Sequence, residues 1–176
     1  MYSKAKIGGH PLHPMLVAFP IAFYTATLVS YIAYWTTGNP FWFHVAVVAN
    51  IAGVGTAFVA AVPGFIDWAF GVPTGSPAKT TGMFHMLLQV GALVIFAIDA
   101  VLQWHKWGAV APTVGASVLL ALLGTTLTMI GGALGWKMIG THHVGVDLTP
   151  EQERLEPRAN AREPRVIAHP TALPPL

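Results

Sequence analysis

The chain has 176 residues, of which 54% are hydrophobic and only 9% are charged, against about 25% charged residues in ordinary soluble domains. This composition excludes an ordinary soluble domain and indicates a membrane protein. The net charge of +2 is too small to suggest a nucleic-acid partner, and the absence of cysteine excludes disulfides and cysteine-held metal or iron–sulfur sites.

Four apolar runs are long enough to cross a bilayer, which takes about 20 mostly apolar residues. They cover residues 15–35, 41–62, 83–104 and 112–136. Pro20 lies inside the first run, where it either kinks a helix or marks a turn. The connections after the first and third runs are short, so neighbouring helices run antiparallel. We therefore predict an all-α membrane protein, with an antiparallel bundle of four transmembrane helices.

The bundle accounts for residues 1–147, and the composition changes abruptly after it. Residues 148–176 are charged and then rich in proline, without any hydrophobic period. Such a segment cannot bury enough apolar surface to order itself. We expect a disordered tail on the cytoplasmic side.

Two histidines stand directly before the first apolar run. His10 precedes Pro11 and His13 precedes Pro14. A residue before proline is pushed toward extended backbone, and Pro14 suits the first turn of a helix. Both histidines are therefore expected to be held stiffly at the start of the first helix.

The antiparallel order brings further polar residues to the same membrane face as the N-terminus. These are His10, His13, Asp67, His85, His142 and His143. The lysines near helix ends on this face are Lys4, Lys6, Lys79 and Lys137, against Lys106 on the other. Positive residues favour the cytoplasm, so we predict both termini to be cytoplasmic in the cell (inner) membrane.

Four short motifs carry a resemblance to a known family. They are Gly-His-Pro-Leu-His-Pro-Met-Leu-Val at 9–17, Val-Pro-Gly-Phe-Ile-Asp-Trp at 62–68, Phe-His-Met at 84–86 and His-His-Val-Gly-Val at 142–146. The chain resembles small bacterial four-helix membrane proteins, catalogued as a domain of unknown function and sometimes fused to Rieske-type iron–sulfur domains. The resemblance implies this fold and a redox context. Residues 135–141 depart from the family's closing motif, and His143 stands where glycine is common, so the family histidine maps to His142.

The first hypothesis for the histidines is a haem b site, because imidazole is a common axial ligand of haem iron and helical bundles hold cofactors between helices. His85 with His13 or His142 would be the axial pair. Lys79, Lys137 or His10 would meet the propionates. The function would be one-electron transfer, for example between a quinone and a Rieske-type or other redox protein in a larger membrane complex.

Two alternatives stay open on the sequence alone. His10, His13, His85 and His142, with Asp67 as a carboxylate ligand, could bind a simple transition-metal ion. Alternatively the same histidines form a hydrogen-bonded clasp that joins the first helix to the third and fourth.

The remaining polar residues have plainer interpretations. Asp99 lies near the far end of the third run and is expected to reach water there, and His44 and His105 are expected to be ordinary interfacial residues. The sequence carries no G-x-S-x-G or phosphate-binding motif. The sequences of the first two helices show no obvious similarity to those of the last two, which disfavours a transporter built of internal repeats.

Overall fold

The computed structural model describes residues 3–146 and Glu151, so the expected tail lies almost wholly outside the described residues. The helices are α1 (Leu12–Leu16), α2 (Ala18–Thr37), α3 (Pro40–Ile66), α4 (Pro77–Trp104) and α5 (Gly115–Gly140), with a π-helical turn η1 (Asp67–Gly71) after α3. Four segments of the described chain are long and apolar enough to cross a membrane. This confirms the predicted fold class.

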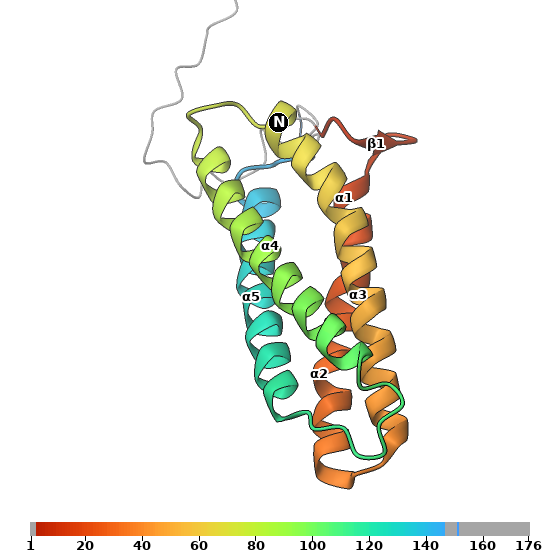
Figure 1. Cartoon of the computed structure of the whole chain (residues 1–176). Helices are drawn as coiled ribbons and strands as arrows, with labels where there is room; N and C mark the ends of the chain where they lie inside the picture. The colour runs from red at the N-terminus through yellow and green to blue at the C-terminus, as the bar shows by residue number, and fades with distance from the viewer. Residues whose placement is uncertain (1–2, 147–150, 152–176) are drawn as a thin grey trace, which may run out of the picture.

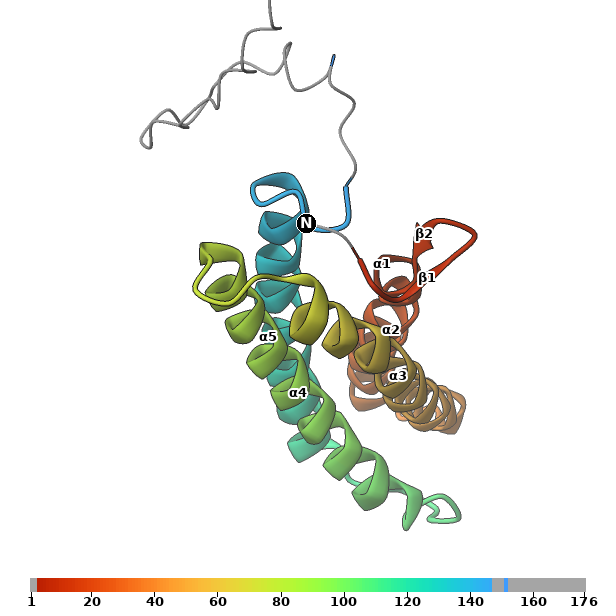
Figure 2. The same cartoon turned by 90° about the horizontal axis from the view of Figure 1, so that it is seen from above.

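The four long helices run antiparallel to their neighbours in the bundle (Figures 1 and 2). The most extensive contacts are between α2 and α3 and between α4 and α5, so the chain folds as two helix hairpins. Helix α3 also contacts α4, and α2 contacts α5. Helices α2 and α4 therefore lie diagonally across the bundle, and their long side chains meet at its centre.

The second and third helices extend beyond the spans expected from the sequence. Helix α4 begins at Pro77, where the Ser76 side chain accepts a hydrogen bond from the backbone N–H of Lys79. A serine cap followed by proline is a strong helix start. His85 therefore lies in the third turn of α4, and not in the first turn, where the expected start at residue 83 would place it. Similarly, Pro63 does not end α3, which continues to Ile66 and then into η1.

The first membrane segment is interrupted at Val17, between α1 and α2. Pro20 has no N–H with which to bond the Leu16 carbonyl one turn earlier, so the helical ladder is broken there. His13 lies inside α1 and is helical, which corrects the expected extended conformation. His10 lies in the short strand β2 (His10–Pro11), paired antiparallel with β1 (Lys6–Ile7), and is extended as predicted.

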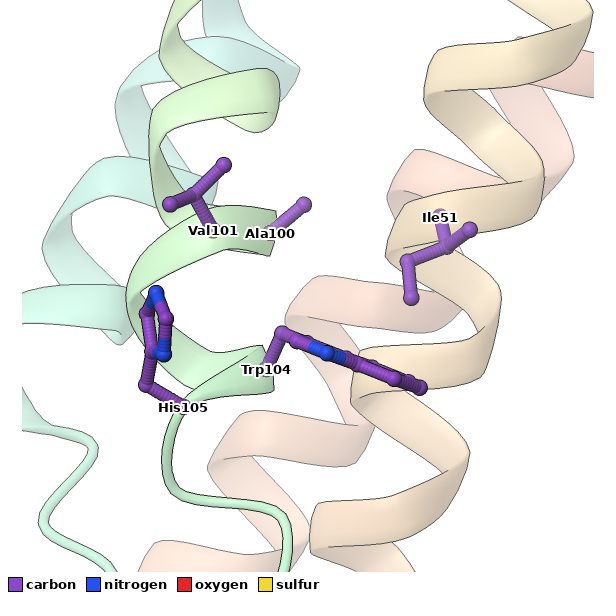
Figure 3. A pocket seen from close by; sticks show the side chains of 5 residues that line it. All are labelled: Ile51, Ala100, Val101, Trp104 and His105. Atoms are coloured by element: carbon purple, nitrogen blue, oxygen red, sulfur yellow. The ribbon is translucent and has the colours of Figure 1, made fainter.

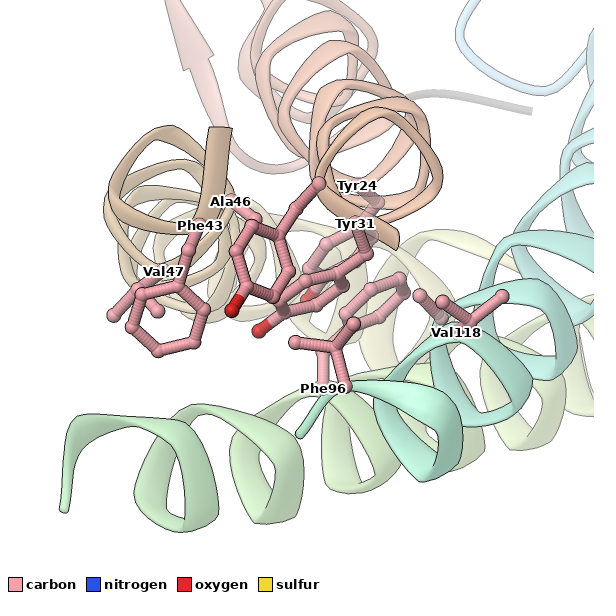
Figure 4. Close-up of a cluster of buried hydrophobic side chains, with 10 residues drawn as sticks. Tyr24, Tyr31, Phe43, Ala46, Val47, Phe96 and Val118 are labelled. Atoms are coloured by element: carbon pink, nitrogen blue, oxygen red, sulfur yellow. The ribbon is translucent and has the colours of Figure 1, made fainter. Parts of the chain in front are cut away.

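The centre of the bundle is filled by buried aromatic side chains. Tyr24 and Tyr31 on α2 reach toward Phe96 on α4 (Figure 4). The rings of Tyr24 and Phe96 are stacked, with centres 3.7 Å apart and planes 3° from parallel. Large apolar side chains such as Phe58, which is 65% exposed, point outward, as expected for a surface in contact with lipid tails. The bundle is therefore closed at its middle.

Candidate functional site

His13 is held against the second helix of its own hairpin. Its Nδ1 lies 2.8 Å from the backbone oxygen of Ala60 on α3. The imidazole packs directly on Gly64, where an added Cβ would lie 2.6 Å from Nδ1. Hydrogen bonding and close packing together hold His13 in a helical conformation that its position before Pro14 disfavours.

His85 is held in the same way in the second hairpin. Its Nδ1 lies 2.7 Å from the backbone oxygen of Gly131 on α5. The ring packs on Gly135, where an added Cβ would lie 3.1 Å from Cε1. Gly131 and Gly135 are spaced four residues apart, as in helices that pack closely, and here they accommodate this imidazole.

The two imidazoles, here called the histidine pair, leave the same ring nitrogen available. A backbone oxygen only accepts hydrogen bonds, so Nδ1 of each ring must carry the proton and Nε2 of a neutral ring keeps its lone pair. The ring centres are 6.0 Å apart and the planes are 86° from parallel. A histidine that donates one N–H to a carbonyl is typical of metal-binding histidines, because that bond fixes the ring.

The histidine pair lies at an end of the bundle where inward-facing side chains are accessible. His13, His85 and Gln89 are only half-buried. At the opposite end, Asp99 and Gln103 on the same face of α4 are 0% and 2% exposed. In Figure 1 the ribbons of α3 and α4 lie further apart at the histidine end. The inward-facing side chains are therefore less buried at the histidine end than at the opposite end.

The histidine pair is part of a repeat that relates the hairpin α1–α3 to the hairpin α4–α5. Equivalent residues 72 positions apart on the first helices are His13 and His85, Tyr24 and Phe96, Thr27 and Asp99, and Tyr31 and Gln103. Equivalent residues 71 positions apart on the second helices are Val47 and Val118, Gly53 and Gly124, Ala60 and Gly131, and Gly64 and Gly135. Nearly all of these residues are inward-facing and buried or half-buried.

The same contacts recur within each repeat. In each hairpin a histidine binds one carbonyl and packs on the glycine four residues later. A ring eleven residues after the histidine packs on a second glycine, Gly53 for Tyr24 and Gly124 for Phe96. Because both hairpins begin at the same face, an approximate twofold axis runs along the bundle. This corrects the expectation from the sequence that the two hairpins are not repeats of each other.

The other predicted histidines lie outside the pair. Nε2 of His142 lies 3.4 Å from the hydroxyl of Thr81 on α4, and His10 is exposed on β2. His143 has a positive φ of 50° after α5. Within residues 3–146 no group of three histidine or acidic side chains is arranged to hold a metal ion.

Asp67 and Lys79 make local structural contacts. The Asp67 carboxylate accepts hydrogen bonds from the Ser3 hydroxyl at 2.8 Å and from the backbone N–H groups of Lys4 at 2.6 Å and Ala5 at 2.8 Å. The Lys79 ammonium donates to the backbone oxygens of Trp68, Ala69 and Val72. These oxygens are left unpaired where the helical ladder ends. Asp67 thus anchors the N-terminal segment, and Lys79 caps η1.

Asp99 is fully buried, which corrects the expectation that it reaches water. Its Oδ2 accepts hydrogen bonds from the Tyr31 hydroxyl at 2.9 Å and from Nδ2 of Asn50 at 2.8 Å. Asp99 lies near the end of α4, but on the face that α4 turns toward the other helices. Distance along the chain alone could not reveal which way it points.

The histidines of the opposite end have no comparable arrangement. Nδ1 of His44 lies 2.8 Å from the Pro40 oxygen and its Nε2 lies 3.3 Å from the Trp107 oxygen. This ring therefore links the start of α3 to the segment that follows α4. His105 borders a shallow, mostly apolar pocket (Figure 3). The pocket is lined by Ile51, Ala100, Val101, Trp104 and His105. These contacts point to local packing.

Comparison with known proteins identifies the family. No curated protein and no solved structure matches the chain. The sequence model of a family described as Predicted membrane protein (DUF2231) matches residues 9–148, which include the histidine pair and all four membrane segments. The chain is thus a member of the DUF2231 family of predicted membrane proteins.

Proposed function

We propose that this membrane protein is an electron-transfer subunit that holds a haem b between His13 and His85. The observation that carries the proposal is the pair itself, with two imidazoles fixed by Nδ1–carbonyl bonds and related by the internal twofold axis. A porphyrin has two equivalent faces, each open to one axial ligand. A pair formed from one histidine per repeat matches that symmetry.

The separation of the ring centres is close to that expected for two imidazole ligands on one metal. Metal–imidazole bonds are about 2.0–2.1 Å long, so one ion bonded by Nε2 atoms from opposite sides would hold the ring centres about 6 Å apart. The observed separation is 6.0 Å. No cysteine is needed for a b-type haem, which agrees with a chain that has none.

The protein residues would set the properties of such a site. Bound haem supplies one-electron redox chemistry. The carbonyls of Ala60 and Gly131 orient the imidazoles and raise the basicity of Nε2. His10 and Lys137, exposed at this end, are available to propionates, whereas Lys79 is engaged with η1. A quinone and a soluble Rieske-type partner, within a larger membrane complex, are the redox partners that we propose.

The test is the visible absorption spectrum of protein purified from haem-replete cells, oxidised and then reduced with dithionite. We expect a Soret band and a sharp reduced α-band. His13→Ala and His85→Ala should each abolish the low-spin spectrum, because each removes one axial ligand. His44→Ala and His10→Ala are matched controls that should leave it intact. A chain that carries no haem would contradict the proposal.

A second candidate is a structural or simple-metal role, favoured by the way each histidine bonds a neighbouring helix of its own hairpin. Elemental analysis of haem-free protein distinguishes the structural role from the metal-binding role. Stoichiometric zinc, copper, iron or nickel that is lost in His13→Ala and His85→Ala supports an ion held by the pair. Metal-free protein, destabilised by both substitutions, supports a clasp.

We also propose that the histidine end faces the cytoplasm, because Lys4, Lys6, Lys79 and Lys137 lie there and, within residues 3–146, only Lys106 lies opposite. The chain has no cysteine, so single cysteines can report its orientation. A membrane-impermeant maleimide added to intact spheroplasts should label Val110→Cys, at a site 96% exposed, but should label Thr74→Cys only after lysis. The reverse pattern would overturn the orientation.

A further inference from the structure

The opposite half of the bundle contains a buried polar network that the histidine site does not use. Its members come from α2, α3, α4 and α5 and are Tyr31, Asn50, Asp99, Gln103 and Ser117. None of them is more than 2% exposed. Ionisable and amide side chains inside a membrane protein are expensive, and their presence there is a functional hypothesis by default.

Part of this network is well paired. Oδ2 of Asp99 accepts hydrogen bonds from Tyr31 and Asn50, and Nε2 of Gln103 donates to the Ser117 hydroxyl. Both donors to Asp99 are uncharged groups. The carboxylate therefore has hydrogen bonds on one oxygen but no positive charge from these partners.

Three buried oxygens in the network have no hydrogen-bond donor: Oδ1 of Asp99, Oδ1 of Asn50 and Oε1 of Gln103. Leaving one such group unpaired costs on the order of 1–3 kcal/mol, and more for a charged group. Three orphan acceptors in one network are unusual, because buried polar groups are nearly always satisfied. Each of the three can accept a hydrogen bond or bond a cation.

We propose that Asp99, Asn50 and Gln103 bind a dehydrated monovalent cation of the Na⁺ class between the four helices. A proton on Oδ1 of Asp99 would supply one O–H donor, and the Ser117 hydroxyl, which accepts from Gln103, has one O–H of its own to donate. Protonated Asp99 is therefore the competing state, and the test below separates it from a bound cation. A hard cation would bond such oxygens directly, since carboxylate and amide oxygens are the ligands that such ions prefer. The nearby hydroxyls of Tyr31 and Ser117 offer further oxygen ligands.

The charge of the network selects a monovalent ion. Asp99 is its one acidic residue, so Na⁺ would neutralise the site, whereas a divalent ion would leave a buried positive charge. The internal repeat supports a specific role. The counterparts of Asp99 and Asn50 are Thr27 and Ala121, which cannot supply a carboxylate and an amide. The proposed cation site is thus present in only one of the two repeats, whereas each repeat contributes one histidine to the histidine pair.

The test is the thermal stability of the purified full-length protein in detergent, at fixed pH and ionic strength, in NaCl, KCl or choline chloride. A ligand that binds only the folded state raises Tm with its concentration. We expect a rise of roughly 3 °C for each tenfold increase in Na⁺ above its Kd. Equilibrium binding of ²²Na⁺ should give one ion per chain. An equal Tm in NaCl and in choline chloride overturns the proposal. A Tm that changes with pH but not with Na⁺ concentration overturns it as well.

Two variants locate the site. Asp99→Asn preserves the size of the side chain but removes its charge, and should abolish the Na⁺ dependence of Tm and ²²Na⁺ binding. Thr27→Val is the matched control, because Thr27 is equally buried and bonds only the Phe23 carbonyl of its own helix. It should retain both signals. If Asp99→Asn does not fold, absence of ²²Na⁺ binding to the wild-type chain still refutes the site.

Discussion

Asp99→Leu should lower the free energy of unfolding by about 3–5 kcal/mol, because it leaves the Tyr31 hydroxyl and the Asn50 amide buried without their acceptor. Leucine is similar in size, so the loss is one of hydrogen bonding rather than of volume. The measurement is SDS titration or thermal unfolding in detergent at a fixed Na⁺ concentration. Ile98→Leu, at a neighbouring position that is 51% exposed to lipid, is the control and should change little.

A double-mutant cycle separates the orphaned hydroxyl from the rest of this loss. Tyr31→Phe alone removes one donor and should cost about 1 kcal/mol. In the Asp99→Leu background the same change removes an unpaired buried hydroxyl, so it should be neutral or stabilising. The two changes should therefore be less than additive by about 1–2 kcal/mol. Strict additivity would show that the Tyr31–Asp99 bond contributes nothing to stability.

Composition and the length of the hydrophobic runs were sufficient to predict the architecture. Four long apolar runs and short connections predicted four antiparallel membrane helices, and the structure confirms them. The helix starts were harder to place, because Ser76 and Pro77 begin α4 in a stretch that reads as a loop. That extension carries no strong hydrophobic signal and is stabilised by capping and by Lys79.

The histidine pair was only partly predictable. The antiparallel order correctly brought six polar residues to one face, but it could not separate His13 and His85 from His10 and His142. That separation depends on side-chain direction and on contacts to Gly64 and Gly135, which are far apart in sequence. The direction of Asp99 was missed for the same reason.

The internal repeat explains why the two halves of the bundle differ chemically. At the histidine end both hairpins keep the same residue types, so a symmetric site results. At the opposite end the counterpart of Thr27 is Asp99 and the counterpart of Tyr31 is Gln103. The buried centre there is polar, and its carboxyl group comes from the second repeat alone. Tyr24 and Phe96 lie between them and stack on the axis. The inward-facing side chains are thus half-buried in one half of the bundle and fully buried in the other.

The stack of Tyr24 and Phe96 gives the second large prediction. An added Cβ at Gly53 would lie 2.7 Å from Cδ1 of Tyr24, and one at Gly124 would lie 2.6 Å from Cε2 of Phe96. Neither ring can retreat, because each is stacked on the other at 3.7 Å. We therefore expect Gly53→Ala and Gly124→Ala each to destabilise the fold by about 1–3 kcal/mol through overpacking.

Matched controls exist on the same two helices. Alanine at Gly55 or Gly132 meets nothing within 4 Å, so Gly55→Ala and Gly132→Ala should be neutral or slightly stabilising, since alanine favours helix over glycine. Thermal unfolding of the four variants in detergent gives the comparison. Combining Gly53→Ala with Gly124→Ala should cost at least the sum of the two single changes, because each substitution presses its ring toward the other and removes the room for the other ring to yield. If all four variants unfold like the wild type, the rings are not confined, and the central stack does not hold the two hairpins together.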